Sequence, residues 1–129
     1  MKELKINVAG NREIIPQYYL RVIEFAEAET NLYIKGVINI LIAYNPIQEI
    51  AHAISKSNPP TDFLKHLWVT TPLDLVIRSG GANLLSNFLP LQSGFARLIF
   101  RNELFNDLTI RDFKLILNEF SEIDRKFGD

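Results

Sequence analysis

The chain has 129 residues, of which 47% are hydrophobic and 22% are charged, so it is long enough for one globular domain with a core and too apolar for a disordered segment. Its net charge of −1 offers no electrostatic basis for binding nucleic acid. The absence of cysteine excludes disulfides and thiol catalysis and favours a cytoplasmic location. The most apolar stretch, GVINILIAY (36–44), is too short to span a bilayer, and we expect no transmembrane segment.

The first predicted elements are a strand, a helix and a second strand. Alternating apolar residues predict a strand over 4–9 that ends in a glycine turn. Apolar residues at helical spacing predict a helix over 13–29. We expect the core face of this helix to consist of Ile15, Tyr18, Tyr19, Val22, Phe25 and Ala26. A run rich in β-branched residues at 34–43, apolar at successive positions, predicts a strand that is covered on both faces.

The middle of the chain predicts two helices separated by a proline-containing loop. Pro46 fits the first turn of a helix, which we expect over 47–56. The segment 61–68 predicts a second, short helix that has Thr61 or Asp62 as its cap.

Two short strands and a long helix complete the predicted elements. We expect strands at 74–78 and 96–100. Thr109 fits the cap of a last helix over 110–126, with Asp112 three residues further on. The core face of this helix is expected to consist of Phe113, Ile116, Leu117, Phe120, Ile123 and Phe127. The order of elements predicts an α/β fold, with a mostly parallel sheet and helices on both of its faces.

The strand at 74–78 ends in residues that are suited to binding an anion. The candidate residues for a diphosphate site are Arg78, Gly80, Gly81 and Ser86. Arginine is a planar cation that matches phosphate oxygens, paired glycines can expose backbone N–H groups to an anion, and a helix beginning near Leu85 would add its dipole. These residues also fall at the carboxyl end of a strand, where parallel sheets bind ligands. The residues alone leave a second interpretation open, a tight turn in which Arg78 pairs with an acid such as Asp74.

The same stretch carries a resemblance to a known family. DLVIRSGGANLLSNFLPLQSGFARLIF (74–100) resembles the C-terminal signature of the cis-prenyltransferases, the undecaprenyl diphosphate synthase family. That signature has Asp-Leu-apolar-Ile-Arg-Thr/Ser-Gly-Gly-Glu, then Arg-apolar-Ser-Asn-Phe-Leu, a Gln, and Glu-Leu-Tyr-Phe. NVAGNREIIP (7–16), GVINILIAYNPIQEI (36–50) and DRKFGD (124–129) resemble further segments of the family. The resemblance implies a single truncated domain over 1–129, with the fold of the C-terminal half of that synthase.

The family's activity assigns a role to the candidate residues. Cis-prenyltransferases build linear polyprenyl diphosphates by adding isopentenyl diphosphate units in cis geometry, and they use magnesium. The resemblance implies that Arg78 and Ser86 bind the diphosphate of isopentenyl diphosphate, while Gly80 and Gly81 form the loop around it. It also implies a dimer, because the family dimerises through its C-terminal region and some members pair an active with an inactive subunit.

Several positions depart from the family pattern. The family's second diphosphate-binding arginine falls on Leu84. Its magnesium-binding glutamate falls on Arg97, which could replace part of the missing charge if its side chain reaches the same crevice. The family's glutamate after the two glycines is replaced by Ala82, and the family's Gly-Gly-Arg falls on residues 45–47. The family's Asp-Gly-Asn-Gly-Arg motif, which carries the catalytic aspartate, has no counterpart after Met1. We therefore expect no catalytic residue, no metal or other cofactor, and no prenyl transfer by this chain alone.

Three functions follow from these observations. We expect a non-catalytic or partner-dependent member of the family, which keeps a partial site for an isopentenyl diphosphate-like anion. It would dimerise with itself, with an intact cis-prenyltransferase or with an N-terminal half. The alternatives are the separately encoded C-terminal half of an active cis-prenyltransferase and a small α/β anion-binding protein unrelated to prenyl chemistry. Leu84 and Arg97 favour the non-catalytic hypothesis, because an active enzyme would need both of the groups that they replace.

Overall fold

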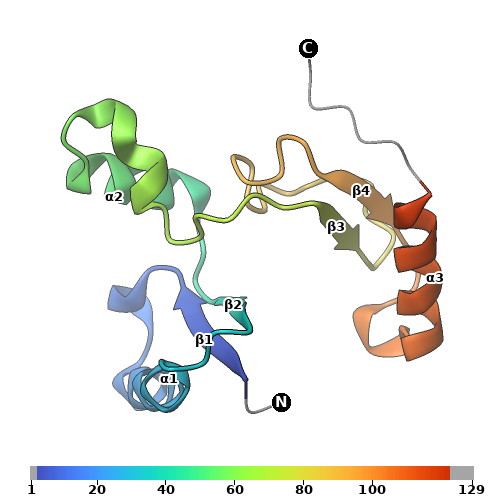
Figure 1. Ribbon diagram of the computed structural model, residues 1–129, viewed down its shortest axis with the longest axis horizontal. Coiled ribbons are helices and arrows are strands. Elements are labelled where there is room, and N and C mark those ends of the chain that lie inside the picture. Colours follow the sequence, from blue (N-terminus) through green and yellow to red (C-terminus); the bar gives the residue numbers. More distant parts are fainter. Residues whose placement is uncertain (1–2, 123–129) are drawn as a thin grey trace. The chain divides into compact units, whose positions relative to one another are not determined.

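Two compact units, residues 1–70 and 71–129, make up the structure, a computed structural model that describes residues 3–122. Each unit contains one pair of parallel strands together with helices (Figure 1). The predicted α/β class with parallel strands is therefore confirmed. Within residues 3–122, every helix is too short or too polar to cross a bilayer.

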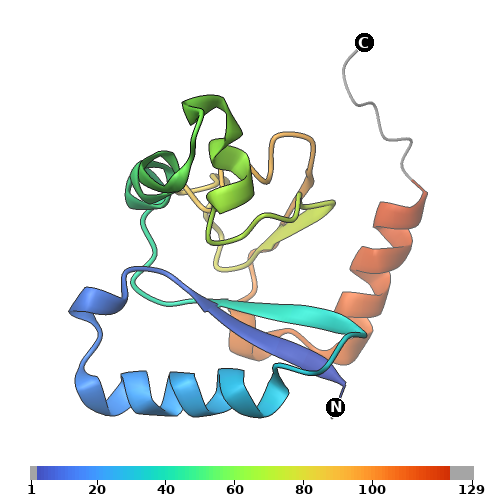
Figure 2. The ribbon, with the colours of Figure 1, turned by 60° about the vertical axis from the view of Figure 1, so that its left-hand side comes forward.

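The first unit follows the predicted order of elements. Its elements are β1 (Leu4–Ala9), a 3₁₀ turn (Arg12–Ile14), α1 (Gln17–Thr30), β2 (Gly36–Leu41), α2 (Pro46–Lys56) and a 3₁₀ helix (Pro60–His66). β1 and β2 pair along their whole lengths, and α1 runs along β1 (Figure 2). Pro46 lies in the first turn of α2, as predicted, and the side chain of Asn45 accepts hydrogen bonds from the first backbone N–H groups of that helix.

The buried face of α1 differs from the predicted one. Ile15 and Ile23 form the core of the unit with Val8 of β1, and Leu20 packs against them. Four residues of the predicted core face are more than half exposed: Tyr18, Tyr19, Val22 and Phe25. The prediction was wrong because apolar side chains surround most of this helix, so their spacing alone does not select the side that meets β1. The helix also begins at Gln17 rather than at residue 13, since a proline precedes it.

The segment after α2 is a 3₁₀ helix over Pro60–His66 and not the predicted α-helix. Neither Thr61 nor Asp62 caps it; it follows Pro59 and has no side-chain cap. The physical reason is the pair of prolines at its start. They lack N–H groups and restrict the backbone, so that a short, tight 3₁₀ turn forms there.

β2 is more exposed than a strand that is covered on both faces. Val37, Ile38 and Ile40 are 56%, 42% and 42% exposed. The prediction of double coverage was wrong for the described residues of β2, because α1 packs along β1.

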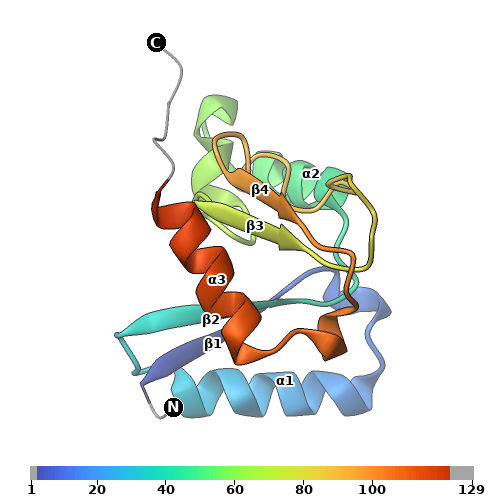
Figure 3. The ribbon, with the colours of Figure 1, turned by 90° about the vertical axis from the view of Figure 1, so that its right-hand side faces the viewer.

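The second unit contains the strand pair that carries the candidate site. Its elements are β3 (Leu75–Arg78), β4 (Arg97–Phe100), a 3₁₀ turn (Phe105–Asp107) and α3 (Ile110–Ser121). β3 and β4 lie side by side and run in parallel, with Leu75 opposite Arg97 and Arg78 opposite Phe100 (Figure 3). All four strands fall within about two residues of their predicted bounds, as expected for strongly patterned segments.

The cap of α3 is confirmed. Asp112 accepts a hydrogen bond from the backbone N–H of Thr109 at 2.8 Å, and the Thr109 hydroxyl accepts one from the Asp112 N–H at 3.3 Å. The hydrogen bonds that Thr109 donates lower the pKa of Asp112. On the predicted core face, Ile116 is fully buried, whereas Leu117 is exposed. Phe113 and Phe120 are half-buried, and Ile123, Phe127 and the predicted helix beyond residue 122 lie outside the described residues.

Candidate functional site

Arg78 is the last residue of β3, at the carboxyl end of a parallel strand. Its side chain is half-buried, and among residues 3–122 it forms no ion pair. The alternative pair with Asp74 is not formed, because four residues along a strand separate the two positions by about 13 Å. The guanidinium of Arg78 is thus a cation without a carboxylate partner in the described part of the chain.

Gly80 and Gly81 shape the turn that follows Arg78. Their φ angles of +87° and +76° lie in the region that favours glycine. The N–H of Gly80 donates to the Glu103 carbonyl at 2.8 Å, and the N–H of Gly81 donates to the Arg101 carbonyl at 3.0 Å. The Arg101 N–H in turn donates to the Arg78 carbonyl at 2.8 Å. Both glycine amides are therefore engaged with the chain after β4, so an anion would have to rely on side chains at this turn.

Ser86 lies in a loop of turns between β3 and β4. The predicted helix near Leu85 is absent: Phe88 N–H closes a turn onto the Leu85 carbonyl at 3.0 Å. Ser86, Asn87 and Leu89 have φ angles of +51°, +57° and +45°, and left-handed residues cannot continue a right-handed helix. The helix dipole is thus not available, while the exposed Ser86 hydroxyl makes no hydrogen bond within residues 3–122.

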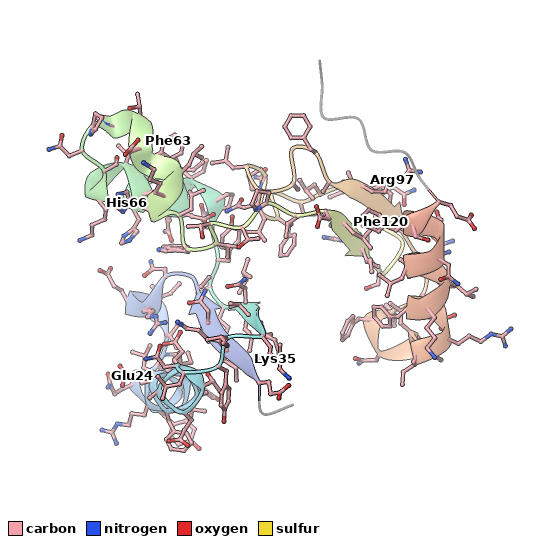
Figure 4. All side chains as sticks on the ribbon, viewed as in Figure 1. Glu24, Lys35, Phe63, His66, Arg97 and Phe120 are labelled. Atoms are coloured by element: carbon pink, nitrogen blue, oxygen red, sulfur yellow. The ribbon has the colours of Figure 1, made fainter. Side chains whose placement is uncertain are left out.

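Arg97 does not join Arg78. It is the first residue of β4 (Figure 4) and pairs with Leu75, three residues from the pair that Arg78 makes with Phe100, an offset of about 10 Å along the strands. Paired residues share a face and successive residues alternate, so Arg97 also points to the face opposite Arg78. The expectation that Arg97 could replace the missing second charge is therefore wrong, and Leu84, in the position of that charge, is exposed.

A hollow that the sequence patterns do not indicate lies at the carboxyl end of β1. Its volume is ≈ 400 Å³, and it is lined by residues 7–13 with His52 and Trp68. Arg12, its cation, donates to both carboxylate oxygens of Glu27, at 2.7 and 2.9 Å. Burial raises the pKa of Glu27. The hydrogen bonds from Arg12 and from the Val8 N–H, together with the positive charges of Arg12 and Lys5, outweigh this effect and lower the pKa below its ordinary value. Arg12 is thus neutralised, which makes this hollow a weaker anion site than the end of β3.

Glu49 of α2 is a buried acid that the apolar pattern could not reveal. It is 1% exposed, and its two carboxylate oxygens accept hydrogen bonds from the Tyr44 hydroxyl at 2.7 Å and the Val69 N–H at 3.1 Å. It therefore ties α2 to the segments on both sides of it. Within residues 3–122, three or more potential ligand side chains do not gather in any place suited to a metal ion.

Parallel strand pairs with a cation at the end of one strand define an α/β protein with a candidate anion site. Comparison with known proteins gives its family. The sequence model of the undecaprenyl diphosphate synthase family (Prenyltransf) matches residues 1–128. The chain therefore belongs to this family of prenyltransferases.

Individual relatives agree with that assignment. The chain is 31% identical to the tritrans,polycis-undecaprenyl-diphosphate synthase (geranylgeranyl-diphosphate specific) of Pyrococcus abyssi, over 97% of this chain and 53% of the relative. It is 33% identical to the ditrans,polycis-undecaprenyl-diphosphate synthase ((2E,6E)-farnesyl-diphosphate specific) of Buchnera aphidicola, over 97% of this chain and 56% of the relative. The chain thus spans about half the length of the curated relatives that it matches.

Solved structures show the same fold. A probable undecaprenyl diphosphate synthase from Campylobacter jejuni matches with a TM-score of 0.90 and 28% identity, over 98% of this chain and 64% of its own. Lavandulyl diphosphate synthase from Lavandula x intermedia, solved with dimethylallyl diphosphate, matches with a TM-score of 0.87 over 100% of this chain and 62% of its own. At 23% identity, the latter likeness concerns the fold alone.

Proposed function

We propose that this chain is a partner-dependent, by itself non-catalytic subunit of cis-prenyltransferase type, which binds the diphosphate of an isopentenyl diphosphate-like anion through Arg78 and Ser86. The observation that carries the proposal is the half-buried Arg78 guanidinium at the carboxyl end of β3, without an acid partner in residues 3–122. An arginine in that position binds phosphate oxygens in a planar, bidentate manner. The Ser86 hydroxyl supplies a further donor.

The same residues support a non-catalytic role. Arg97 replaces the glutamate that the family uses for magnesium. Leu84 removes a second arginine from the diphosphate, and each hydrogen bond to a charged group contributes about 1.5–3 kcal/mol. We therefore propose weak anion binding without magnesium. The lack of cysteine supports a cytoplasmic location, and the family resemblance supports a dimer.

A second candidate function is the separately encoded C-terminal half of an active cis-prenyltransferase. It is favoured by the family match over residues 1–128. Polyprenyl product formed when the chain is mixed with a polypeptide that carries the other half would favour this candidate over the non-catalytic subunit. The third hypothesis, an anion-binding protein unrelated to the family, is excluded by the family match over residues 1–128.

Arg78→Ala is expected to weaken diphosphate binding by about ten- to hundredfold, because one arginine supplies most of the positive charge in this site. Isothermal titration of sodium diphosphate into both proteins, with magnesium and with EDTA, measures the effect. The exposed Arg21 of α1 allows a matched control, since Arg21→Ala removes the same charge elsewhere and should leave the affinity unchanged. Equal affinities for Arg78→Ala and Arg21→Ala, or binding that EDTA abolishes, would contradict the proposal.

Ser86→Gly is expected to change stability and binding in opposite directions. The φ of +51° at Ser86 costs an L-residue about 1–2 kcal/mol that glycine avoids, so we expect a gain of about 1 kcal/mol in the free energy of unfolding after the entropic cost of glycine is subtracted. Loss of the hydroxyl should weaken diphosphate binding about tenfold. Urea unfolding and titration measure the two quantities. Ser86→Ala is the control, which should lose the affinity without the gain in stability; unchanged affinity in both variants would remove Ser86 from the site.

A further inference from the structure

The loop between β3 and β4 is held in an unfavourable backbone conformation. Ser86, Asn87 and Leu89 have φ angles of +51°, +57° and +45°. Such left-handed angles bring the Cβ atom of an L-residue close to the following carbonyl oxygen, and of these three residue types only asparagine adopts them readily. A strained backbone persists only where the surrounding structure fixes it, and strained segments are common at ligand-binding sites. The contacts that fix this loop therefore also determine where the Ser86 hydroxyl lies.

Leu89 attaches the loop to the interior of its unit. Its side chain is 3% exposed, whereas Ser86, Asn87 and Phe88 are exposed. Removal of a leucine side chain from water is favourable, and a change of the Leu89 backbone to an ordinary conformation would redirect that side chain. Burial of Leu89 thus offsets the strain of its own backbone.

Ser93 holds the same residue through its carbonyl group. The Leu89 carbonyl oxygen accepts a hydrogen bond from the Ser93 N–H at 2.9 Å and a second one from the Ser93 hydroxyl at 2.8 Å. A carbonyl oxygen has two lone pairs, so one residue uses its full capacity. Ser93 is 8% exposed, and hydrogen bonds are stronger in such surroundings than in water. The Ser93 hydroxyl therefore fixes the orientation of the peptide group that follows Leu89.

The segment around Ser93 is joined to both strands of the pair. The Leu73 N–H, just before β3, donates to the Gln92 carbonyl at 2.8 Å. The Ala96 N–H, just before β4, donates to the Ser93 carbonyl at 3.0 Å. Ser93 thus has a fixed position relative to the sheet, and its bonds to Leu89 extend that order into the loop.

The turn that contains Ser86 ends next to this anchor. The Phe88 N–H donates to the Leu85 carbonyl at 3.0 Å, which closes a turn around Ser86 and Asn87. Leu89 follows directly. Rotation of the Leu89 peptide group would therefore move the end of the turn and, with it, the Ser86 hydroxyl.

We infer that Ser93 is a positioning residue of the diphosphate site, because its hydroxyl, bonded to the Leu89 carbonyl, holds Ser86 in place for the anion. This inference rests on the proposed function, in which Ser86 donates to the diphosphate, and it adds a residue that acts through Ser86. A donor that is ordered before binding loses less conformational freedom when the anion arrives. Ser93→Ala should therefore weaken diphosphate binding, although it removes neither a charge nor a donor to the anion.

Isothermal titration of sodium diphosphate into wild type, Ser93→Ala, Ser86→Ala and the double variant tests the inference. We expect Ser93→Ala to bind about fivefold more weakly than wild type, the effect of one lost buried hydrogen bond. Because Ser93 acts through Ser86, the double variant should bind like Ser86→Ala, and the two losses should not multiply. Ser93→Cys keeps the shape of the side chain and a weak donor, and its affinity should lie between those of wild type and Ser93→Ala.

Two control variants separate positioning from a general loss of stability. Ser121→Ala removes a hydroxyl of α3 that likewise donates to a backbone carbonyl, that of Asn118 at 2.7 Å. Ile116→Val removes a methyl group from a fully buried side chain of the same unit, which lowers its stability. Urea unfolding measures the loss of stability in each variant. Both controls should bind diphosphate as wild type does.

The NMR chemical shifts of the Ser86 Cα and Cβ atoms provide a second readout, because they depend on the backbone angles of that residue. In wild type they should correspond to the left-handed conformation. Ser93→Ala should move them toward the values of a flexible chain, whereas Ile116→Val should leave them unchanged.

Four outcomes would overturn the inference: equal affinity for wild type and Ser93→Ala, losses that multiply in the double variant, unchanged Ser86 chemical shifts in Ser93→Ala, or equal weakening by Ile116→Val. Absence of diphosphate binding by wild type would instead contradict the proposed function. The chemical shifts, which are measured without the anion, would then still decide whether Ser93 sets the backbone of Ser86.

Discussion

Gly10→Ala is expected to destabilise the first unit by about 3 kcal/mol or more, a large part of the stability of a small protein. Gly10 has a φ of +142°, and a Cβ atom at this position would lie 1.8 Å from the carbonyl oxygen of Ile42. That carbonyl cannot move freely. The Ile42 N–H donates to Ala9 at 3.0 Å, and the Asn11 N–H donates to Ala43 at 3.2 Å, so relief of the clash would break the bonds that join the ends of β1 and β2.

Urea unfolding followed by the fluorescence of Trp68, the one tryptophan of the chain, measures this loss. Gly36→Ala is the matched control at the other end of the same sheet. Its Cβ would lie 3.0 Å from the Cδ2 atom of Leu4, the end of a flexible side chain, and we expect a loss below about 1 kcal/mol. Equal unfolding midpoints for the two variants would show that the close approach at Gly10 does not limit stability.

Glu49→Ala is expected to cost about 3 kcal/mol. The variant leaves a cavity where a fully buried side chain stood, and it removes both carboxylate oxygens, one of which accepts from the Tyr44 hydroxyl at 2.7 Å and the other from the Val69 N–H at 3.1 Å. Loss of an acceptor from buried donors costs about 1–3 kcal/mol for each donor, and the cavity adds to this. The fluorescence of the neighbouring Trp68, whose ring lies 6.2 Å from that of Tyr44, should report the unfolding.

Glu49→Gln provides the control, because it keeps the shape and one carbonyl oxygen. We expect a smaller loss of stability, of about 1 kcal/mol. Glutamine keeps one of the two acceptor oxygens, and that oxygen carries no charge. If Glu49→Ala and Glu49→Gln unfold at the same urea concentration, the hydrogen bonds of Glu49 contribute little and the residue is tolerated rather than required. Neither variant alters Arg78, so diphosphate affinity at low urea concentration should be unchanged in both.

Local sequence chemistry predicted the elements that depend on neighbouring residues. Pro46 marks the start of α2, and Thr109 with Asp112 marks the start of α3, because caps and prolines act within one turn of the chain. The strand at the candidate site was also predictable, since β3 is a short apolar run that ends at Arg78, shortly before two glycines. A short helix was predicted at 61–68, but its 3₁₀ type and its start at Pro60 were not, because the two prolines were treated as loop residues and not as part of the helix.

The sequence by itself determined the family, the parallel α/β class and the position of Arg78 at a strand end, because motifs, periodicity and caps are properties of short segments. Only the tertiary structure decided how those segments meet. In the structure, the amides of Gly80 and Gly81 donate hydrogen bonds to carbonyls of the chain after β4. Arg97 lies on the face opposite Arg78, and Ile23 is buried whereas Tyr19 is exposed. The tertiary structure also closed the edge of β1 with side chains of α1. Each of these outcomes depends on strand register and helix rotation, which are set by contacts between residues far apart in the chain and leave no local pattern in the sequence.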